Sequence, residues 1–337
     1  MIWVILILGF LFGAILQYAR LNKYDVISRL STLEDLTVAK AVVVAIGVGA
    51  IIINIEIALG IAGYHVKPFI FGGVVLGGLI FGAGMAVLGY CPGTLAVSFG
   101  EGALDALTGI IGGLLGGLVF TMVKPSISGI LGPNLGKISL FTITGGSNVL
   151  FFILLFIIAI AFIYFSFWMD KKENGTNKKW LYSGIALAVL NAFVFLGSVT
   201  NRPIGASTTY PYLADYLTGL TQNAYFQKIQ TPGHWEMIFL TGAFLAGLII
   251  SLIKKDFQLR LIYSNWEHYK GSNNLSRIIW AFIGGFVLVF GARMAGGCTS
   301  GHILSGGMQL AVSSLVFAVF VFTGLLITGK LFYRKSA

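Results

Sequence analysis

The sequence predicts an all-α polytopic membrane protein with about nine transmembrane helices, additional re-entrant segments and an inverted internal repeat. Three observations indicate this fold class. The chain of 337 residues is 57% hydrophobic and 10% charged, whereas soluble domains carry about 25% charged residues. Apolar runs recur along the chain, each long enough to cross a hydrocarbon core of about 30 Å. Two glycine-rich segments of similar sequence each hold one of the two cysteines, which indicates a duplicated unit.

Nine apolar stretches are the expected transmembrane helices. The first lacks a basic n-region and a small-residue cleavage site, so we expect a retained helix and not a signal peptide. The predicted spans are 1–18, 37–60, 68–89, 103–123, 147–169, 181–199, 236–253, 277–296 and 309–330.

Several connections between these spans carry Gly, Pro, Ser and Thr where a surface loop would carry charges. Non-helical backbone at membrane depth persists only where it is buried in protein or lines a water-filled cavity. Re-entrant or broken-helix segments are therefore expected near 91–102, 203–220 and 298–308.

The distribution of Lys and Arg predicts the orientation. With the N-terminus outside, sixteen of these residues fall in cytoplasmic connections and five in outer ones, while Arg293 lies within a span. Basic residues favour the cytoplasmic side, so we expect the N-terminus outside and the C-terminus in the cytoplasm. The formal charge of +10 then reflects topology, and no nucleic-acid partner is expected.

This orientation makes the two cysteine segments run in opposite directions. The span that ends at Cys91 runs toward the cytoplasm, and the span that ends at Cys298 runs outward. We expect a first repeat at 1–146, a linking span and basic loop at 147–180, and a second repeat at 181–337. Inverted repeats of this kind place a substrate site near the membrane midplane. In the alternative interpretation the duplication is a scaffold, and its glycines only let helices pack closely.

The two cysteine turns carry the expected chemistry. Similar hexamers at 81–86 and 290–295 precede them, with five of six positions identical. Proline and glycine end a helix and free backbone N–H groups for an anion, and a thiol adds a soft contact that favours sulfur over oxygen. A lone buried cysteine is more often a small hydrophobic residue, but two at matching positions favour a functional role. The candidate residues are Cys91, Gly93, Thr94, Cys298, Thr299, Ser300, Gly301 and His302.

Arg293 and Glu56 are ionisable residues within predicted spans. Such residues are costly unless they are paired or face a cavity, so each is a functional candidate. For Arg293 the structural alternative is an ion pair with Glu101 or Asp105. Glu56 could serve a proton or ion path or pair with a basic residue, and His302 could donate to an anion or cap a turn.

Other functional classes lack their signals. The four histidines are scattered and the cysteines form no CxxC pair, so no metal site is expected. Nucleotide-binding loops and Ser-His-Asp arrangements are not visible either. We therefore expect no catalytic residue, no cofactor and no enzymatic activity.

The segments 89–94 and 291–302 resemble those of the YeeE/YedE sulfur-transport family of bacterial membrane proteins. Together with 13–20 and 201–206, the resemblance covers essentially the whole chain. It implies a nine-span, pseudo-symmetric, hourglass-shaped fold in the bacterial cytoplasmic membrane, in which cysteines pass thiosulfate along by S–H···S contacts. Cys91 and Cys298 fall on two family cysteine positions. Asn22 stands where a third cysteine would fall, which puts the transport rate and the preferred sulfur species in question.

The sequence therefore favours an uptake permease for thiosulfate or a closely related sulfur anion, with Cys91 and Cys298 as a central relay. The basic groups Arg20, Arg202 and Arg293 are expected to draw the anion in. The alternatives are a transporter of another sulfur or selenium species, a membrane sulfurtransferase that works through a cysteine persulfide, and a scaffold subunit. The expected partners are the lipid bilayer and a small cytoplasmic sulfur-carrier or sulfurtransferase protein.

Overall fold

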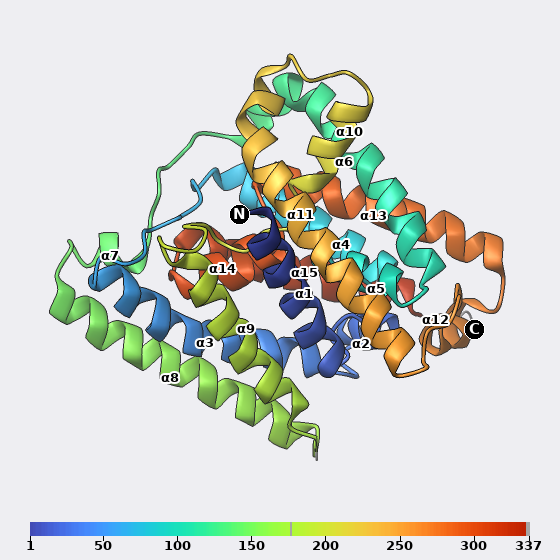
Figure 1. The fold of residues 1–337 in the computed structure, drawn as a ribbon, viewed down its shortest axis with the longest axis horizontal. Helices are drawn as coiled ribbons and strands as arrows, with labels where there is room; N and C mark the ends of the chain where they lie inside the picture. Colours follow the sequence, from blue (N-terminus) through green and yellow to red (C-terminus); the bar gives the residue numbers. More distant parts are fainter. Residues whose placement is uncertain (176, 335–337) are drawn as a thin grey trace.

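The computed structural model describes residues 1–175 and 177–334, and in this part it consists of helices and loops, with isolated bridges but no β-strand (Figure 1). Nine long apolar helices follow the predicted spans. They are α1 (Ile2–Tyr18), α3 (Thr37–Ala58), α4 (Phe71–Leu88), α6 (Leu104–Leu131), α8 (Asn148–Lys172), α9 (Lys179–Phe195), α11 (Ala224–Ile253), α13 (Asn274–Ala295) and α15 (Val312–Phe332). Seven of these are long and apolar enough to cross a membrane, while α1 and α9 have 17 residues each. The protein is a polytopic all-α membrane protein, as predicted.

Short helices fill the connections. Those in the three predicted broken segments are α5 (Pro92–Gly100), α10 (Thr209–Leu217), and the π-helical turn η1 (Thr299–Leu304) followed by α14 (Ser305–Met308). The sequence analysis did not predict α2 (Tyr24–Leu30), α7 (Leu140–Ile143) or α12 (Ser264–Lys270).

Two helices extend beyond their predicted spans. α11 begins at Ala224 instead of residue 236, and α6 continues to Leu131 instead of residue 123. Each extension contains an internal proline, Pro232 or Pro125. Polar side chains in the added turns of α11 hid them from a hydropathy pattern, because a helix outside the hydrocarbon core need not be apolar. The two extensions group with α10 at the top of Figure 1.

The two halves of the chain pack through reciprocal helix pairs. In one set of corresponding pairs, α4 packs against α15 and α13 packs against α6. In the other set, α1 packs against α11 and α9 packs against α3. Gly77 lies against Gly291 and Gly84 against Gly284, so α4 and α13 run antiparallel. Close packing of this kind uses small residues at the interface. Two halves of opposite orientation would pack in this way, and the inverted repeat itself stays a prediction.

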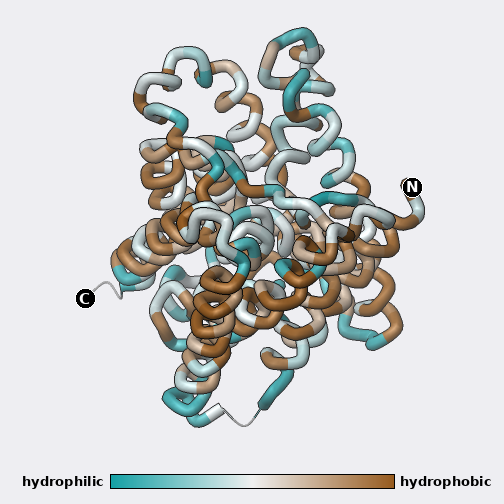
Figure 2. The backbone as a smooth tube through the Cα atoms, turned by 90° about the vertical axis from the view of Figure 1, so that its left-hand side faces the viewer, coloured by the Kyte–Doolittle hydropathy of each residue, from teal (hydrophilic) through white to brown (hydrophobic). Residues whose placement is uncertain are grey.

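Helix α8, the predicted linking span, lies at the edge of the bundle beside α3 (Figure 1). Only 22% of its apolar window is buried, against 44–56% in α3, α4, α6, α11 and α13. Figure 2 shows hydrophobic residues along the helices and hydrophilic ones near helix ends and connections. The exposed apolar side chains of α8 include Val149, Ile153, Ile157 and Ile160. This surface is suited to contact with lipid.

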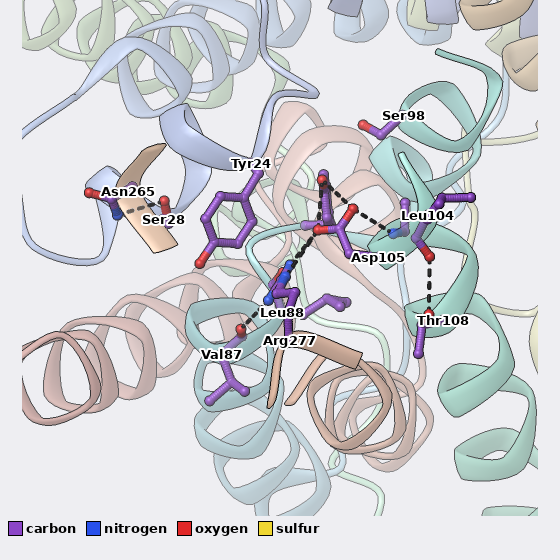
Figure 3. Close-up of polar contacts among 12 residues, drawn as sticks. Tyr24, Ser28, Val87, Leu88, Ser98, Leu104, Asp105, Thr108, Asn265 and Arg277 are labelled. Carbon is purple, nitrogen blue, oxygen red and sulfur yellow. Dashed lines mark hydrogen bonds and ion pairs between the residues drawn. The ribbon is translucent and has the colours of Figure 1, made fainter. Parts of the chain in front are cut away.

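A fully buried ion pair joins α6 to α13 (Figure 3). The Arg277 guanidinium contacts the Asp105 carboxylate at 2.5 Å, and both side chains are 0% exposed. Tyr90 donates to Asp105 at 3.1 Å, Arg277 donates to the Leu88 carbonyl at 2.8 Å, and the guanidinium stacks on the Tyr24 ring. The sequence analysis included Arg277, at the start of the span 277–296, among the sixteen basic residues of the cytoplasmic connections. That placement is wrong, because the residue lies in the first turn of α13 and faces the protein interior.

Packing at the α4–α13 contact gives a stability prediction. A Cβ added at Gly84 would lie 2.4 Å from the Leu288 nitrogen, whereas one added at Gly129 in α6 would meet nothing within 4 Å. Overpacking costs about 1–3 kcal/mol, so Gly84→Ala should lower the thermal unfolding midpoint of the purified protein in detergent. Gly129→Ala should leave the midpoint unchanged or raise it slightly. Equal midpoints for the two variants would contradict this contact.

Candidate functional site

The two cysteine turns have the same local construction. Gly89 follows α4 and Gly296 follows α13, both in the left-handed conformation with φ of 78° and 79°. Two residues later, Cys91 and Cys298 are the extended N-cap residues of α5 and η1. A side chain at Gly89 is excluded twice, since its Cβ would also lie 2.3 Å from the Tyr24 ring.

This correspondence corrects the register that the hexamers suggested. The two turns are 207 residues apart, whereas the similar hexamers at 81–86 and 290–295 are 209 residues apart. The left-handed glycine fixes where the helix ends, so the turns are equivalent while the hexamers are shifted by two positions. Gly84 therefore corresponds to Gly291, and Ala86 to Arg293.

Hydrogen bonds hold the first turn. The Thr94 hydroxyl accepts from the Cys91 N–H at 2.9 Å and donates to the Cys91 carbonyl at 3.0 Å. The buried Tyr210 hydroxyl of α10 donates to the Pro92 carbonyl at 3.1 Å. Tyr210 also lies within electrostatic range of both Cys91 and Cys298. α10 therefore braces the first turn through this hydrogen bond.

The second turn is more deeply buried. The Cys298 thiol is 1% exposed and contacts the Ser300 hydroxyl at 3.2 Å. The ring nitrogens of His302 bond to the Ser314 hydroxyl at 3.0 Å and the Ala295 carbonyl at 2.9 Å. Because the carbonyl only accepts, Nε2 carries the proton and Nδ1 accepts from Ser314. His302 thus ties the turn to α13 and α15, with no ring nitrogen left for an anion.

Both turns line one cavity of about 90 Å³. Cys91, Gly93 and Thr94 reach it from the first turn, and Thr299 and Ser300 from the second. The rest of the lining is apolar and includes Phe12, Met85 and Ile303. Cys298, Gly301 and His302 lie behind this lining. The two turns therefore contribute residues to the wall of one small, almost entirely apolar space.

A cationic group lies next to Cys298. Arg293 is 7% exposed and donates to the hydroxyls of Tyr225 at 2.7 Å and of Ser207 and Thr208 at 3.1 Å. Lys67, in the connection between α3 and α4, donates to the Gly296 carbonyl at 2.7 Å. We call Lys67, Arg202, Arg293 and Glu236 the outer cluster.

Electrostatics in the outer cluster favour an anion. Burial, and then the nearby Arg293, lower the pKa of Lys67, whereas Glu236 and Cys298 oppose this change. Arg202 lies over the Trp235 ring at 5.4 Å and within range of Glu236. Lys67, Arg202 and Arg293 thus each lie within electrostatic range of the single carboxylate Glu236, which leaves the cluster with a net positive charge.

The structural alternative for Arg293 is wrong. Among the described residues Glu101 pairs with Lys23 and Asp105 pairs with Arg277, and Arg293 forms no ion pair. Its partners are hydroxyl groups, which satisfy a buried guanidinium without neutralising it. Glu56 likewise forms no ion pair within the described residues.

Asn22 and Arg20 lie away from the cavity. The fully buried Asn22 amide donates to Glu101 at 2.9 Å and to Ser98 at 3.3 Å, while its Oδ1 has no partner. Exposed Arg20 lines a separate basin of about 390 Å³ with Lys23 and Arg29. Asn22 therefore serves here as a donor to Glu101 and does not line the space between the cysteine turns.

Helix α2 separates this basin from the cavity. Ile27 and Leu30 line the cavity, whereas Lys23, Val26 and Arg29 line the basin. Asp25 holds the helix against α12 by accepting from the Ser264 hydroxyl and the Asn265 N–H, each at 2.9 Å. α2 is thus the barrier at this end of the cavity.

Sequence reasoning missed three residues around the site. Tyr210 lay within the predicted broken segment 203–220, Lys67 was counted only as an outer basic residue, and Glu236 stood at the predicted start of a span. Glu236 could have been recognised from the sequence, because a carboxylate at the start of an apolar run is a candidate functional residue. No group of three or more His, Cys, Asp or Glu residues that could hold a metal ion occurs in 1–175 and 177–334.

Comparison with known proteins identifies the family. The profile of the family described as Sulphur transport matches residues 19–327. The chain belongs to this family. It is also 25% identical to the thiosulfate transporter TsuA of Spirochaeta thermophila, over 96% of this chain and 97% of that protein. The family resemblance of the cysteine segments is thereby confirmed, and the seven long apolar helices belong to a multi-pass sulfur transporter.

Proposed function

We propose that this permease takes up thiosulfate, or a closely related sulfur anion, across the bacterial cytoplasmic membrane. The observation that carries the proposal is the cavity of about 90 Å³ that residues of both cysteine turns line, with Cys91 from the first turn and Ser300 from the second. The full-length similarity to a protein named as a thiosulfate transporter supports the substrate.

The geometry suggests a path in three stages. Arg293, Lys67 and Arg202 attract the anion beside Cys298. The anion then passes the Ser300 and Cys91 groups by reversible hydrogen bonds, in which a thiol donates to the terminal sulfur. It leaves through the cavity when α2 moves aside. The contacts are non-covalent, so no enzymatic step and no cofactor is involved.

Uptake of labelled thiosulfate tests the proposal. The gene is expressed in a bacterial host that lacks its own thiosulfate and sulfate uptake systems, and growth is measured on single sulfur sources. Growth and uptake on thiosulfate are expected, with none in the empty-vector control. Growth only on another sulfur or selenium species would replace the substrate. A cysteine persulfide trapped by alkylation and detected by mass would favour a sulfurtransferase.

We also propose the orientation with the N-terminus outside and the C-terminus in the cytoplasm. Cysteines introduced at Lys172 and Lys228 test it in a Cys91→Ala/Cys298→Ala background, so that only the introduced thiol can react. A membrane-impermeant thiol reagent added to intact cells should label Lys228→Cys and not Lys172→Cys. The opposite pattern would reverse the topology. A cytoplasmic sulfur-carrier partner stays a prediction.

Driving force is a separate question for any dianion permease. An inside-negative potential opposes entry by about 2.3 kcal/mol per charge for each 100 mV. Thiosulfate carries two negative charges at neutral pH, so its accumulation needs either rapid consumption inside or a compensating cation.

A further inference from the structure

The basic basin on the far side of helix α2 has no role in the path proposed above. Its volume is about 390 Å³, against about 90 Å³ for the cavity between the cysteine turns. The α1–α2 connection, α2, the start of α9 and the α11–α12 connection contribute to its walls. Five cationic side chains line it, namely Arg20, Lys23, Arg29, Lys179 and Arg260. The basin is therefore large and charged, whereas the cavity is small and apolar.

Most of the positive charge in the basin has no ionic partner. Lys23 pairs with Glu101 at 2.6 Å. Within residues 1–175 and 177–334 the other four cations of the basin form no ion pair. Like charges that share a recess raise its potential and concentrate ions of the opposite sign there. The basin should therefore attract anions.

The two carboxylates that line the basin do not cancel this charge. Asp25 accepts two hydrogen bonds from α12, and Asp35 accepts from the Thr37 N–H, each at 2.9 Å. Apart from the Lys23–Glu101 pair, four cations line the basin together with these two carboxylates. The basin thus keeps a net positive charge.

The size of the basin and the origin of its cations favour a ligand with several linked anionic groups. Arg29 comes from α2, whereas Lys179 and Arg260 come from α9 and from the α11–α12 connection. A single oxyanion fills only part of a space of about 390 Å³, whereas a chain of phosphate groups can reach cations on several walls. Guanidinium groups also bind phosphate oxygens in a bidentate manner.

Helix α2 is suited to control from this basin. It separates the basin from the cavity, and a non-glycine residue in the left-handed conformation lies on each side of it, Arg20 with φ of 60° and Leu33 with φ of 61°. Such residues avoid this conformation, so both connections hold some backbone strain. Residues at the ends of an element commonly act as its hinges. The two connections therefore suit a helix that moves as a unit.

We propose that the basin binds a polyphosphate anion, either inorganic or the phosphate chain of a nucleotide, which holds α2 closed and slows transport. This inference rests on the proposed function, and the proposed orientation puts the basin on the cytoplasmic side. The anion ties Arg29 of α2 to Lys179 and Arg260. Because these cations line one basin while α2 is closed, the anion binds this state more tightly and shifts the equilibrium toward it.

Binding is tested on the purified full chain in detergent at low ionic strength. Tripolyphosphate and magnesium-free ATP are the probes in isothermal titration calorimetry, and one site per chain is expected. Loss of a charge-assisted contact lowers affinity about tenfold, so Arg29→Gln and Arg260→Gln should each weaken binding by this factor. Lys171→Gln removes an equal charge at an exposed site outside the basin and should bind as the wild type does. Equal affinity for the two probes assigns recognition to the phosphate chain, and tighter binding of ATP assigns it to a nucleotide.

Transport is tested by the exchange of labelled for unlabelled thiosulfate in proteoliposomes. Tripolyphosphate is present on both faces, so the orientation of the chain in the vesicle does not affect the result. At a concentration of about ten times the Kd, the probe should slow wild-type exchange about tenfold. Arg260→Gln should exchange normally without the probe. With the probe it should be slowed only about twofold, because its Kd is then close to the probe concentration.

Several results would overturn the inference. These are no binding of either probe, wild-type affinity in both Arg29→Gln and Arg260→Gln, and binding that leaves exchange unchanged. Faster exchange in the presence of the probe would also overturn it and would make the basin part of the exit path. If the wild type exchanges no thiosulfate without the probe, the proposed function and the control of transport both fail, whereas the binding site is still decided by the calorimetry in detergent.

Discussion

Cys91→Ala and Cys298→Ala should each abolish thiosulfate uptake while leaving the protein folded and in the membrane. A methyl group in place of a thiol removes little volume, so the loss of stability should be on the order of 1 kcal/mol. A packing role alone would therefore leave transport near normal. In a constriction with apolar walls nothing replaces the sulfur contact, and transport fails. Initial rates of labelled thiosulfate uptake at matched expression are the measurement.

Serine at the same positions separates the two roles further, because a hydroxyl keeps the hydrogen-bond donor but loses the polarisable sulfur. Cys91→Ser is the more informative change, since Cys91 lines the cavity directly. Cys298 lies behind the lining and contacts Ser300, so Ser300→Ala tests whether it acts through that hydroxyl. Wild-type uptake by both alanine variants would show that the cysteines are core residues.

Asp105→Asn should cause a large loss of stability of the folded protein. It leaves the Arg277 guanidinium fully buried without its counter-charge, and breaking a buried pair in this way costs about 3–5 kcal/mol. The thermal unfolding midpoint in detergent should fall accordingly. Lys171→Gln, at an exposed site at the end of α8, is the control and should change stability by less than about 0.5 kcal/mol.

A double variant shows whether charge or packing is responsible. Replacing both members by apolar residues, as Asp105→Leu with Arg277→Met, removes the unpaired charge and should recover a large part of the lost stability. Tyr90 would lose its acceptor in that variant, so full recovery is not expected. If the double variant is less stable than Asp105→Asn, the pair contributes through its hydrogen-bond network with Leu88 and Tyr90.

The sequence pattern was sufficient for the spans and the cysteine turns because both depend on local properties. Apolar length defines a span, and glycine, proline and cysteine mark a turn at the residue where the helix ends. The sequence alone could not show which side chains from distant segments bond to each other. Arg277 looked like a topology signal until its contact with Asp105, 172 positions away, and Asn22 looked like a cavity residue until its bond to Glu101.

The hexamer similarity misled for a related reason. Repeated apolar and glycine residues at 81–86 and 290–295 satisfy helix packing in more than one register, whereas only Gly89 and Gly296 fix the ends of the helices. Helix α2 escaped prediction because it has only seven residues. A helix of this length gives too few turns for a periodic pattern to stand out.

The apolar lining of the cavity has a consequence for which anions can pass. An ion there exchanges part of its hydration shell for hydrocarbon walls, and the cost of that exchange is greatest for charge that water solvates strongly. Thiosulfate places part of its charge on a large, weakly solvated sulfur, whereas sulfate presents only oxygen atoms to water. We therefore expect the cavity to favour the anion that loses its hydration water more easily. This preference depends on the apolar lining, so it should persist when lysines and arginines at either end of the cavity replace one another.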